Sequence, residues 1–278
     1  MLRCGKYRLS LERPLLMGIV NLTPDSFSGD GVGTSVGLAV AHAHAQFQAG
    51  ADILDLGAES TRPGAPVVTE EEELARLLPV LREVLTWDVP VSVDTYKPAV
   101  MRAALELGCS MINDISGLRH PEALALVSRS DCALCLMHMQ GTPGSMQDNP
   151  CYQDVVSEVN AGLLEAAERC RAAGVAADRL LLDPGFCFGK TVEHNISLFR
   201  GLTVTAAQGY PVLVGVSRKS MLGAITGRPM AQRMPASVAA ALLAAQSGAA
   251  VLRVHDVAAT RDALAVWRAI GFQGEGNV

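Results

Sequence analysis

Aromatic side chains are scarce in this chain of 278 residues: they make up 4% of it, whereas hydrophobic residues as a whole make up 49%. The apolar content therefore comes mainly from Ala, Val and Leu. Small aliphatic side chains of this kind suit helices that pack closely on a parallel sheet. The length provides for one large domain or two small ones, with enough apolar surface for a substantial core.

Long apolar runs and blocks of positive charge are also missing. No uninterrupted apolar stretch reaches about 18 residues, which excludes a membrane span, and residues 1–14 lack the apolar segment of a signal peptide. We therefore expect a cytoplasmic protein. The net charge is −5 and the longest basic block is Arg218-Lys219, so a nucleic-acid partner is not expected. This charge distribution does not exclude a site for a small anion.

The chain has seven cysteines, an odd number that does not suggest a disulfide framework. Cys132 and Cys135 have the spacing of a redox or zinc motif. They belong to a strand-like apolar stretch, however, and no second pair with this spacing follows. We interpret them as small buried hydrophobic side chains.

Short apolar runs recur along the chain, and each ends in residues with polar or functional side chains. The runs span 15–21, 51–62, 89–95, 110–117, 133–139, 179–185, 211–219 and 250–256. Segments with helical periodicity lie between or after them, at 35–51, 69–84, 97–108, 153–174, 235–248 and 260–271. Eight runs that alternate with helical segments predict a (β/α)8 TIM barrel, an α/β fold.

Residues 4–14 alternate in polarity and are expected to form a short N-terminal β-hairpin that closes the bottom of the barrel. No linker or low-complexity segment interrupts the rest, so we expect a single domain over 1–278 with its core at about 14–272. The alternative fold is an open, doubly wound sheet. The absence of GxGxxG after the first run counts against its dinucleotide-binding form.

In a TIM barrel the carboxyl ends of all strands meet on one face, where the active site is built. The residues at these ends are Asn21, Thr61, Arg62, Asp94, Asn113, Met137, Asp183, Ser217, Lys219, Arg253 and His255. The carboxylates and amides among them suit a planar heterocycle with several N–H donors. The cations and hydroxyls suit phosphate or diphosphate. The carbonyl oxygen of Asn21 is a ligand type that Mg²⁺ accepts.

Taken singly, these residues also have structural explanations. Asp94 or Asp183 alone would be a turn former or a helix N-cap, and Lys219 alone a solvated charge. Arg253 and His255 alternate on one strand and could form an ion pair that lines the barrel. The functional interpretation therefore depends on the joint pattern. Two loops rich in Gly, Pro and Ser, at 21–35 and 57–69, suit a cover over an anion.

Eight motifs together resemble the dihydropteroate synthase family of folate biosynthesis. They are MGIVNLTPDSFSGDG (17–31), GAESTRPGA (57–65), VDT (93–95), INDISG (112–117), MHMQGTP (137–143), DPGFCFGK (183–190), GVSRKSML (215–222) and RVHD (253–256). The motifs occur in order from residue 17 to residue 256. The combination of NxTPDSFS with SRK and RxHD is highly specific.

The resemblance implies a pterin-binding TIM barrel, a homodimer that uses Mg²⁺ and joins 4-aminobenzoate to dihydropterin diphosphate by an SN1-like path. It places the pterin at Asp94, Asn113, Met137, Asp183, Gly215, Lys219 and Arg253. It places the diphosphate at Asn21, Thr61, Arg62, Arg253 and His255, with the metal on Asn21. It places the aminobenzoate, where sulfonamides also bind, near Thr61, Arg62, Pro63, Phe188, Lys219 and Ser220. Among these, Asp94, Asp183, Lys219, Arg253 and His255 are the expected catalytic residues, and Ser217 joins the substrate-binding set.

One departure and two alternatives accompany this resemblance. Many family members read FSDGG where this chain reads FSGDG, so the acidic residue of the first loop falls at Asp30. A methyltetrahydrofolate-dependent methyltransferase shares the barrel and pterin pocket but has little need for SRK with RxHD. A non-catalytic pterin-binding relative would be expected to lose phosphate ligands, which are all present here.

Overall fold

Eight parallel strands form a ring at the centre of the structure, a computed structural model that describes residues 1–23, 36–60, 65 and 67–270. The ring consists of β3 (Leu15–Asn21), β4 (Ile53–Gly57), β5 (Val91–Asp94), β6 (Met111–Asp114), β7 (Ala133–Met137), β8 (Leu180–Asp183), β9 (Leu213–Val214) and β10 (Val251–Val254). Their spatial order is β8-β7-β6-β5-β4-β3-β10-β9. A parallel bridge between Leu182 and Val212 joins β8 to the residue before β9. This bridge closes the ring, so the barrel prediction is confirmed and the open sheet is excluded.

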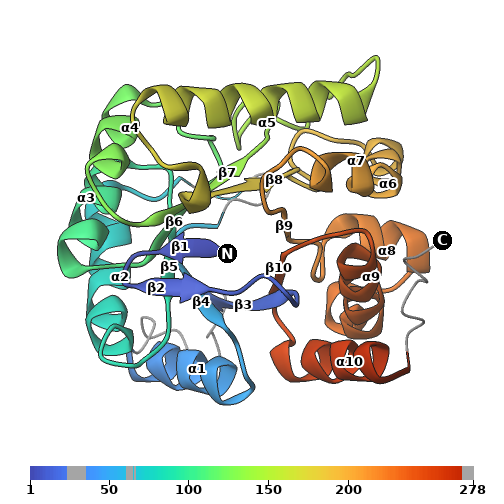
Figure 1. Ribbon diagram of the computed structural model, residues 1–278. Coiled ribbons are helices and arrows are strands. Elements are labelled where there is room, and N and C mark those ends of the chain that lie inside the picture. The colour runs from blue at the N-terminus through green and yellow to red at the C-terminus, as the bar shows by residue number, and fades with distance from the viewer. Residues whose placement is uncertain (24–35, 61–64, 66, 271–278) are drawn as a thin grey trace.

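Helices surround this ring on its outer face (Figure 1). They are α1 (Val36–Gln48), α2 (Glu70–Val84), α3 (Pro98–Leu107), α4 (Pro121–Ser128), α5 (Val155–Ala172), α6 (Val192–Arg200), α7 (Leu202–Ala206), α8 (Ser220–Thr226), α9 (Met234–Gln246) and α10 (Val257–Ile270), with 3₁₀ turns η2 (Ala177–Arg179) and η3 (Met230–Gln232). The six helical segments expected from the sequence are present. Thr69 caps α2 by accepting a hydrogen bond from the Glu72 N–H.

Four helices, α4, α6, α7 and α8, were not predicted from the sequence. Each is short, between five and nine residues, so its hydrophobic periodicity covers too few turns to stand out. Two of them do carry local start signals. Pro121 occupies the first turn of α4, and Thr191 forms a capping box with His194 at the start of α6.

Alternation along the strands sorts their side chains between the outside and the inside of the barrel. Leu54 and Leu56 of β4 belong to the large core between strands and helices. Ile53 of the same strand belongs to a separate cluster inside the barrel. Because the side chains alternate with a period of two, Asp55 and Gly57 also face inward. They lie nearer than Ile53 to the carboxyl end of the strand. The barrel interior is therefore apolar at its amino-terminal end and polar at its carboxyl end.

The N-terminal hairpin, β1 (Leu2–Cys4) paired antiparallel with β2 (Tyr7–Leu9), covers the apolar end of the barrel. Figure 1 shows it lying across the centre of the ring. Leu2 and Cys4 are fully buried, in one cluster with Met17, Met111 and other inward residues from the strand starts. The expected closure of the barrel bottom is confirmed, although the hairpin strands lie at residues 2–9 and not over the expected 4–14.

The two cysteines with redox-like spacing are buried, as expected. Cys132 and Cys135 are at most 2% exposed, and burial raises the pKa of both thiols above the usual range. All seven cysteines are unpaired. Within the described part of the chain, no helix has both the length and the apolar character to cross a membrane.

Candidate active site at the carboxyl ends of the strands

Strand register brings several of the expected residues to one level of the barrel. Asn21 of β3 pairs with Gly57 of β4, Gly57 pairs with Asp94 of β5, and Asp94 pairs with Asn113 of β6. On the other side of the ring, Met137 of β7 pairs with Asp183 of β8. The polar residues predicted from separate parts of the sequence therefore share the carboxyl-terminal face.

Arg253 of β10 crosses the barrel interior and joins two carboxylates. Its Nε donates to Asp55 Oδ2 at 2.6 Å and its Nη2 donates to Asp94 Oδ2 at 2.8 Å. Asn113 Nδ2 donates to the same Asp55 oxygen at 3.3 Å. Asp55 is completely buried, whereas the side chains of Arg253 and Asp94 retain 18% and 16% exposure. Arg253 and Asp94 are thus held in place while they still face the open end of the barrel.

The burial of Asp94 changes its protonation. Removal from water raises the pKa of this carboxyl to about 7, and the nearby Asp55 charge acts in the same direction. The Arg253 guanidinium opposes both effects. Burial also raises the pKa of Asp183, which the Lys219 ammonium opposes. Two carboxyl groups on this face therefore hold a proton more readily than they would in water.

Lys219 lies on the β9 side of this face. Its Nζ donates to the Phe186 carbonyl at 2.8 Å and lies 4.8 Å from the centre of the Phe188 ring. A Cβ added at Gly215 would lie 3.6 Å from the Arg253 Cβ and 4.0 Å from the Lys219 Nζ. Glycine at position 215 therefore keeps open the space between the two cations. Burial lowers the pKa of Lys219.

The two phenylalanines of the 183–190 motif have different roles. Phe186 is fully buried and packs against Phe199, with ring centres 5.5 Å apart. Phe188 lies next to Lys219, against a small buried cluster that includes Met137. Phe188 is therefore the aromatic residue of this loop that is placed to contact a substrate.

His255 and Ser217 meet on the same face. Ser217 Oγ accepts from the His255 backbone N–H at 3.2 Å and lies 3.0 Å from its Nδ1. Gln46 Nε2 donates to the His255 carbonyl at 2.9 Å, which ties the RVHD motif to α1. These contacts fix the backbone of His255 and leave the Nδ1 of its ring directed at a hydroxyl.

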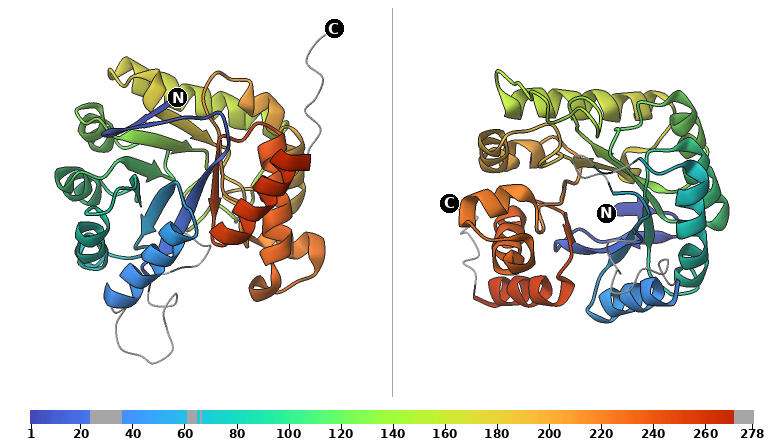
Figure 2. Two further views of the ribbon diagram at one scale, coloured as in Figure 1. Left: turned by 60° about the horizontal axis from the view of Figure 1, so that its bottom comes forward. Right: turned by 180° about the vertical axis from the view of Figure 1, so that it is seen from behind.

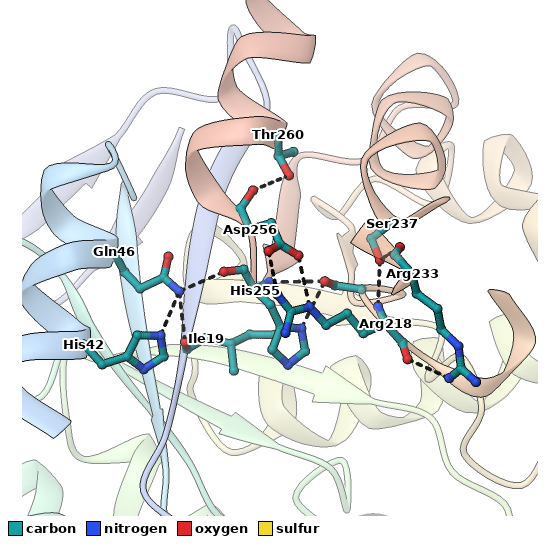
Figure 3. A network of polar contacts seen from close by, with 10 residues as sticks. Ile19, His42, Gln46, Arg218, Arg233, Ser237, His255, Asp256 and Thr260 are labelled. Atoms are coloured by element: carbon teal, nitrogen blue, oxygen red, sulfur yellow. Dashed lines mark hydrogen bonds and ion pairs between the residues drawn. The ribbon is translucent and has the colours of Figure 1, made fainter. Parts of the chain in front are cut away.

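Arg218, between Ser217 and Lys219, adopts a left-handed conformation with φ of 59°. Its guanidinium donates twice to Asp256, and its backbone N–H donates to Ser237 Oγ at 2.9 Å (Figure 3). This side chain thus supports a backbone conformation that is unfavourable for a non-glycine residue. The turn carries Ser217 toward His255 and Lys219 toward Phe188.

A buried ion-pair network holds the described ends of the loop that follows β4. Lys97 Nζ donates to Glu59 Oε2 at 2.8 Å, to Glu73 Oε2 at 2.6 Å and to the Val68 carbonyl at 2.7 Å. Glu59 Oε1 also accepts from the Val68 N–H at 3.1 Å. Glu59 and Val68 flank the loop, so the network fastens its two ends to each other.

Several predicted residues fall outside the described part of the chain. Thr61, Arg62 and Pro63 do so, as does Asp30. Ser220 is exposed at the start of α8, beside Lys219. The remaining expected residues, from Asn21 to His255, lie at the strand ends or directly after them.

Three buried charged residues of this face were not predicted. The sequence does indicate that Asp55 is a special residue, because it is an acidic residue at an inward position of the otherwise apolar strand ILDLG. Lys190 closes the DPGFCFGK motif and is 3% exposed. Lys97 follows Asp94 by three residues, and no sequence pattern around it indicates a buried lysine. Its partners lie 24 and 38 residues away in sequence, so only the fold brings them together.

The donor set at the strand ends fits a magnesium ion that is held mainly by a ligand's phosphates. The described residues contain no group of three or more His, Cys, Asp or Glu side chains that could hold a metal. Asn21 is partly exposed at the end of β3, with no hydrogen bond to its side chain from any other described residue. Mg²⁺ keeps several waters and needs few protein oxygens when phosphate is present, so a single carbonyl ligand is sufficient.

Comparison with known proteins agrees with this geometry. A family model described as pterin binding enzyme matches residues 17–255. The dihydropteroate synthase of Neisseria meningitidis serogroup C is 53% identical over 274 residues, covering 97% of each chain. The structure of Xanthomonas albilineans dihydropteroate synthase with 4-aminobenzoic acid superposes with a TM-score of 0.91 at 51% identity, covering 97% of both chains. That of Burkholderia cenocepacia dihydropteroate synthase with 7,8-dihydropteroate gives 0.89 at 50% identity, covering 97% of this chain and 95% of the other.

Proposed function

The chain belongs to the dihydropteroate synthase family of pterin-binding enzymes, and from that premise we propose how its site carries out the reaction. The reaction transfers the dihydropterin-6-ylmethyl group from diphosphate to the amine of 4-aminobenzoate, giving 7,8-dihydropteroate. The observation that carries the proposal is the Asp55–Arg253–Asp94 arrangement, in which buried Asp55 anchors Arg253 and leaves one cation, Arg253, and one acceptor, Asp94, at the mouth of the barrel.

The pterin ring occupies the polar interior at the strand ends. Asp94 and Asp183 accept hydrogen bonds from its N–H groups, and Asn113 supplies both a donor and an acceptor. Met137 and the backbone at Gly215 contact the face of the pterin ring. Because carboxylates interact more strongly with a cation than with a neutral ring, this pocket favours positive charge that develops on the dihydropterin.

The diphosphate lies above the ring, toward His255 and Arg253. The methylene C–O bond breaks first and its electron pair leaves with the diphosphate oxygen, so the ring system carries the positive charge. Arg253 and His255 stabilise the charge that develops on the leaving group. Asn21 would hold a Mg²⁺ ion, which would further neutralise the charge of the diphosphate. Thr61 and Arg62, outside the described residues, are proposed as additional ligands.

The amine of 4-aminobenzoate then forms the new C–N bond and loses a proton. A cationic acceptor makes a strong base unnecessary, so orientation accounts for much of the rate enhancement. Phe188 and Lys219 contact the aromatic ring, and Ser220 hydrogen-bonds the carboxylate. Pro63 is proposed to border the same subsite. The chain is thus a transferase whose residues act mainly by charge and position.

Diphosphate release by the purified protein tests this proposal. The protein is given the pterin diphosphate and Mg²⁺, with and without 4-aminobenzoate, and dihydropteroate is followed as product. Equal amounts of diphosphate and dihydropteroate support the synthase reaction. Binding of the pterin without either product would contradict it and would indicate a binding-only relative. Methyl transfer from methyltetrahydrofolate would indicate the methyltransferase instead.

We also propose that the protein is a cytoplasmic homodimer. Its seven unpaired cysteines suit a reducing compartment. The last helices expose large apolar side chains, including Ile225 of α8, Leu243 of α9 and Val266 of α10, all three more than 50% exposed. Figure 2 shows these three helices grouped on one side of the barrel. Sedimentation of the protein as a dimer, and of Leu243→Glu as a monomer, would support this assembly.

A further inference from the structure

Lys190 has an unusual environment for a lysine. It ends the loop between β8 and α6 and is 3% exposed. Its Nζ lies 3.0 Å from the carbonyl oxygens of both Gly185 and Phe188, 3.2 Å from His138 Nδ1 and 3.4 Å from the His138 carbonyl oxygen. No described carboxylate forms an ion pair with it. The contacts of this side chain are thus with backbone carbonyls and one imidazole.

The loop that surrounds Lys190 is wound tightly against the end of β7. Gly185, Cys187 and Gly189 all have positive φ, at 68°, 67° and 61°. A Cβ at Gly185 would lie 1.9 Å from the His138 carbonyl oxygen, an impossible approach for any other residue. Such a close turn directs several carbonyls inward, and these need donors. The Nζ of Lys190 supplies them from within the turn.

The same loop supplies what Lys219 contacts. The Phe186 carbonyl accepts from Lys219 Nζ at 2.8 Å, and the Phe188 ring centre lies 4.8 Å from it. Both residues lie between Gly185 and Lys190. The loop conformation therefore determines where Phe188 and Lys219 stand relative to each other.

We propose that Lys190 is a positioning residue for the second substrate: its Nζ holds the 183–190 loop in the conformation that sets Phe188 and Lys219 next to each other at the aminobenzoate subsite. Lys190 acts through these two residues and does not itself contact the substrate. This inference rests on the proposed function and deepens it.

Protonation affects how many donors Lys190 offers. Burial lowers its pKa to about 7, the Lys219 charge acts in the same direction, and Asp183 and Cys187 oppose the shift. Burial also lowers the pKa of His138 to about 3, so its imidazole is neutral and its Nδ1 can accept. As pH rises through 7, Lys190 loses one of its three N–H donors. The loop is then held less firmly on the alkaline side.

Steady-state kinetics of Lys190→Met test the proposal, with Lys6→Met on the exposed hairpin turn as the matched control. The KM for 4-aminobenzoate rises about tenfold in Lys190→Met, the equivalent of one strong hydrogen bond, while the KM for the pterin diphosphate changes little. In wild type the KM for 4-aminobenzoate rises between pH 6 and pH 8, and Lys190→Met loses this dependence. Equal changes in both KM values, or none, would overturn the assignment. If the methionine variant does not fold, Lys190→Gln retains two N–H donors and replaces it.

A second measurement is independent of turnover. The chain has only four lysines, Lys6, Lys97, Lys190 and Lys219, so ¹³Cε-lysine labelling gives four NMR signals. The Lys190→Met variant removes one signal and shifts that of Lys219, whereas Lys6→Met leaves Lys219 unchanged. An unmoved Lys219 signal would refute the positioning role. If wild type makes no dihydropteroate, the proposed reaction fails, and this experiment still decides whether Lys190 orders the loop.

Discussion

Replacement of Arg253 by Met gives a quantitative test of the charge arrangement at the mouth of the barrel. Arg253 joins Asp55 and Asp94, so the three side chains together carry a formal charge of −1 when both carboxyls are ionised. Methionine retains most of the apolar stem but leaves a charge of −2 in a largely buried place. Removing one partner of a buried ion pair costs about 3–5 kcal/mol, and we expect a loss of unfolding free energy of this size at pH 8.

The loss depends on pH, with a sign that follows from Asp94. Its pKa in the folded state is raised to about 7, above the unfolded value of about 4, so ionisation lowers stability as pH rises between these two values. Arg253 opposes this rise in pKa. Without Arg253 the pKa of Asp94 rises further, and the carboxyl stays protonated to higher pH. The variant should therefore lose less stability at pH 5.5 than at pH 8.

Urea unfolding followed by circular dichroism at the two pH values measures these differences. Arg102→Met is the control, because Arg102 and Glu122 form an exposed ion pair at 2.7 Å that contributes at most about 1 kcal/mol. Asp55→Asn added to Arg253→Met removes one of the two uncompensated charges and should recover part of the loss. A loss below about 1 kcal/mol at pH 8, or the same loss at both pH values, would refute the electrostatic explanation.

Three further outcomes are expected. Lys97→Met leaves its two buried glutamate partners uncompensated and should lower the unfolding free energy by about 3–5 kcal/mol, measured by urea denaturation; a loss below 1 kcal/mol would contradict the network's importance. Gly185→Ala should cost roughly 2 kcal/mol or more because of its positive φ and the clash with His138, and clearly more than Gly209→Ala, which has positive φ but open space around it. A chelator should stop dihydropteroate formation until Mg²⁺ is restored, and Asn21→Ala should raise the Mg²⁺ concentration for half-maximal rate; unchanged turnover in excess chelator would exclude the metal.

Much of the fold can be predicted from the sequence because each strand ends in a change of polarity. The run LLMGIVN becomes polar at Asn21, and RLLLDPG does so at Asp183. Parallel strands in a barrel must bring such ends together, so residues far apart in sequence could be assigned to one face. The hairpin was also predictable, from its alternation and its position before the first long strand.

The residues that were missed depend on tertiary contacts. Asp55 gains its role only because Arg253, 198 residues later, reaches across the barrel to it. Lys190 matters because backbone carbonyls converge on it, and the conformation that orients them cannot be read from residue types alone. Short helices such as α7 are stabilised by packing against the barrel. Their hydrophobic pattern covers too few residues to predict a helix from the sequence.

The hairpin at the barrel bottom has a consequence for folding during synthesis. Leu2 and Cys4 are synthesised long before Leu213 of β9 and Val251 of β10, yet they cover a surface that includes both. The hairpin must therefore wait, with its apolar side chains in water or on a chaperone, until the ring has closed. Docking of the hairpin is then a late step that depends on contacts of very long range. A nascent chain halted before β10 should leave the hairpin open to proteases, and synthesis through β10 with release from the ribosome should protect it.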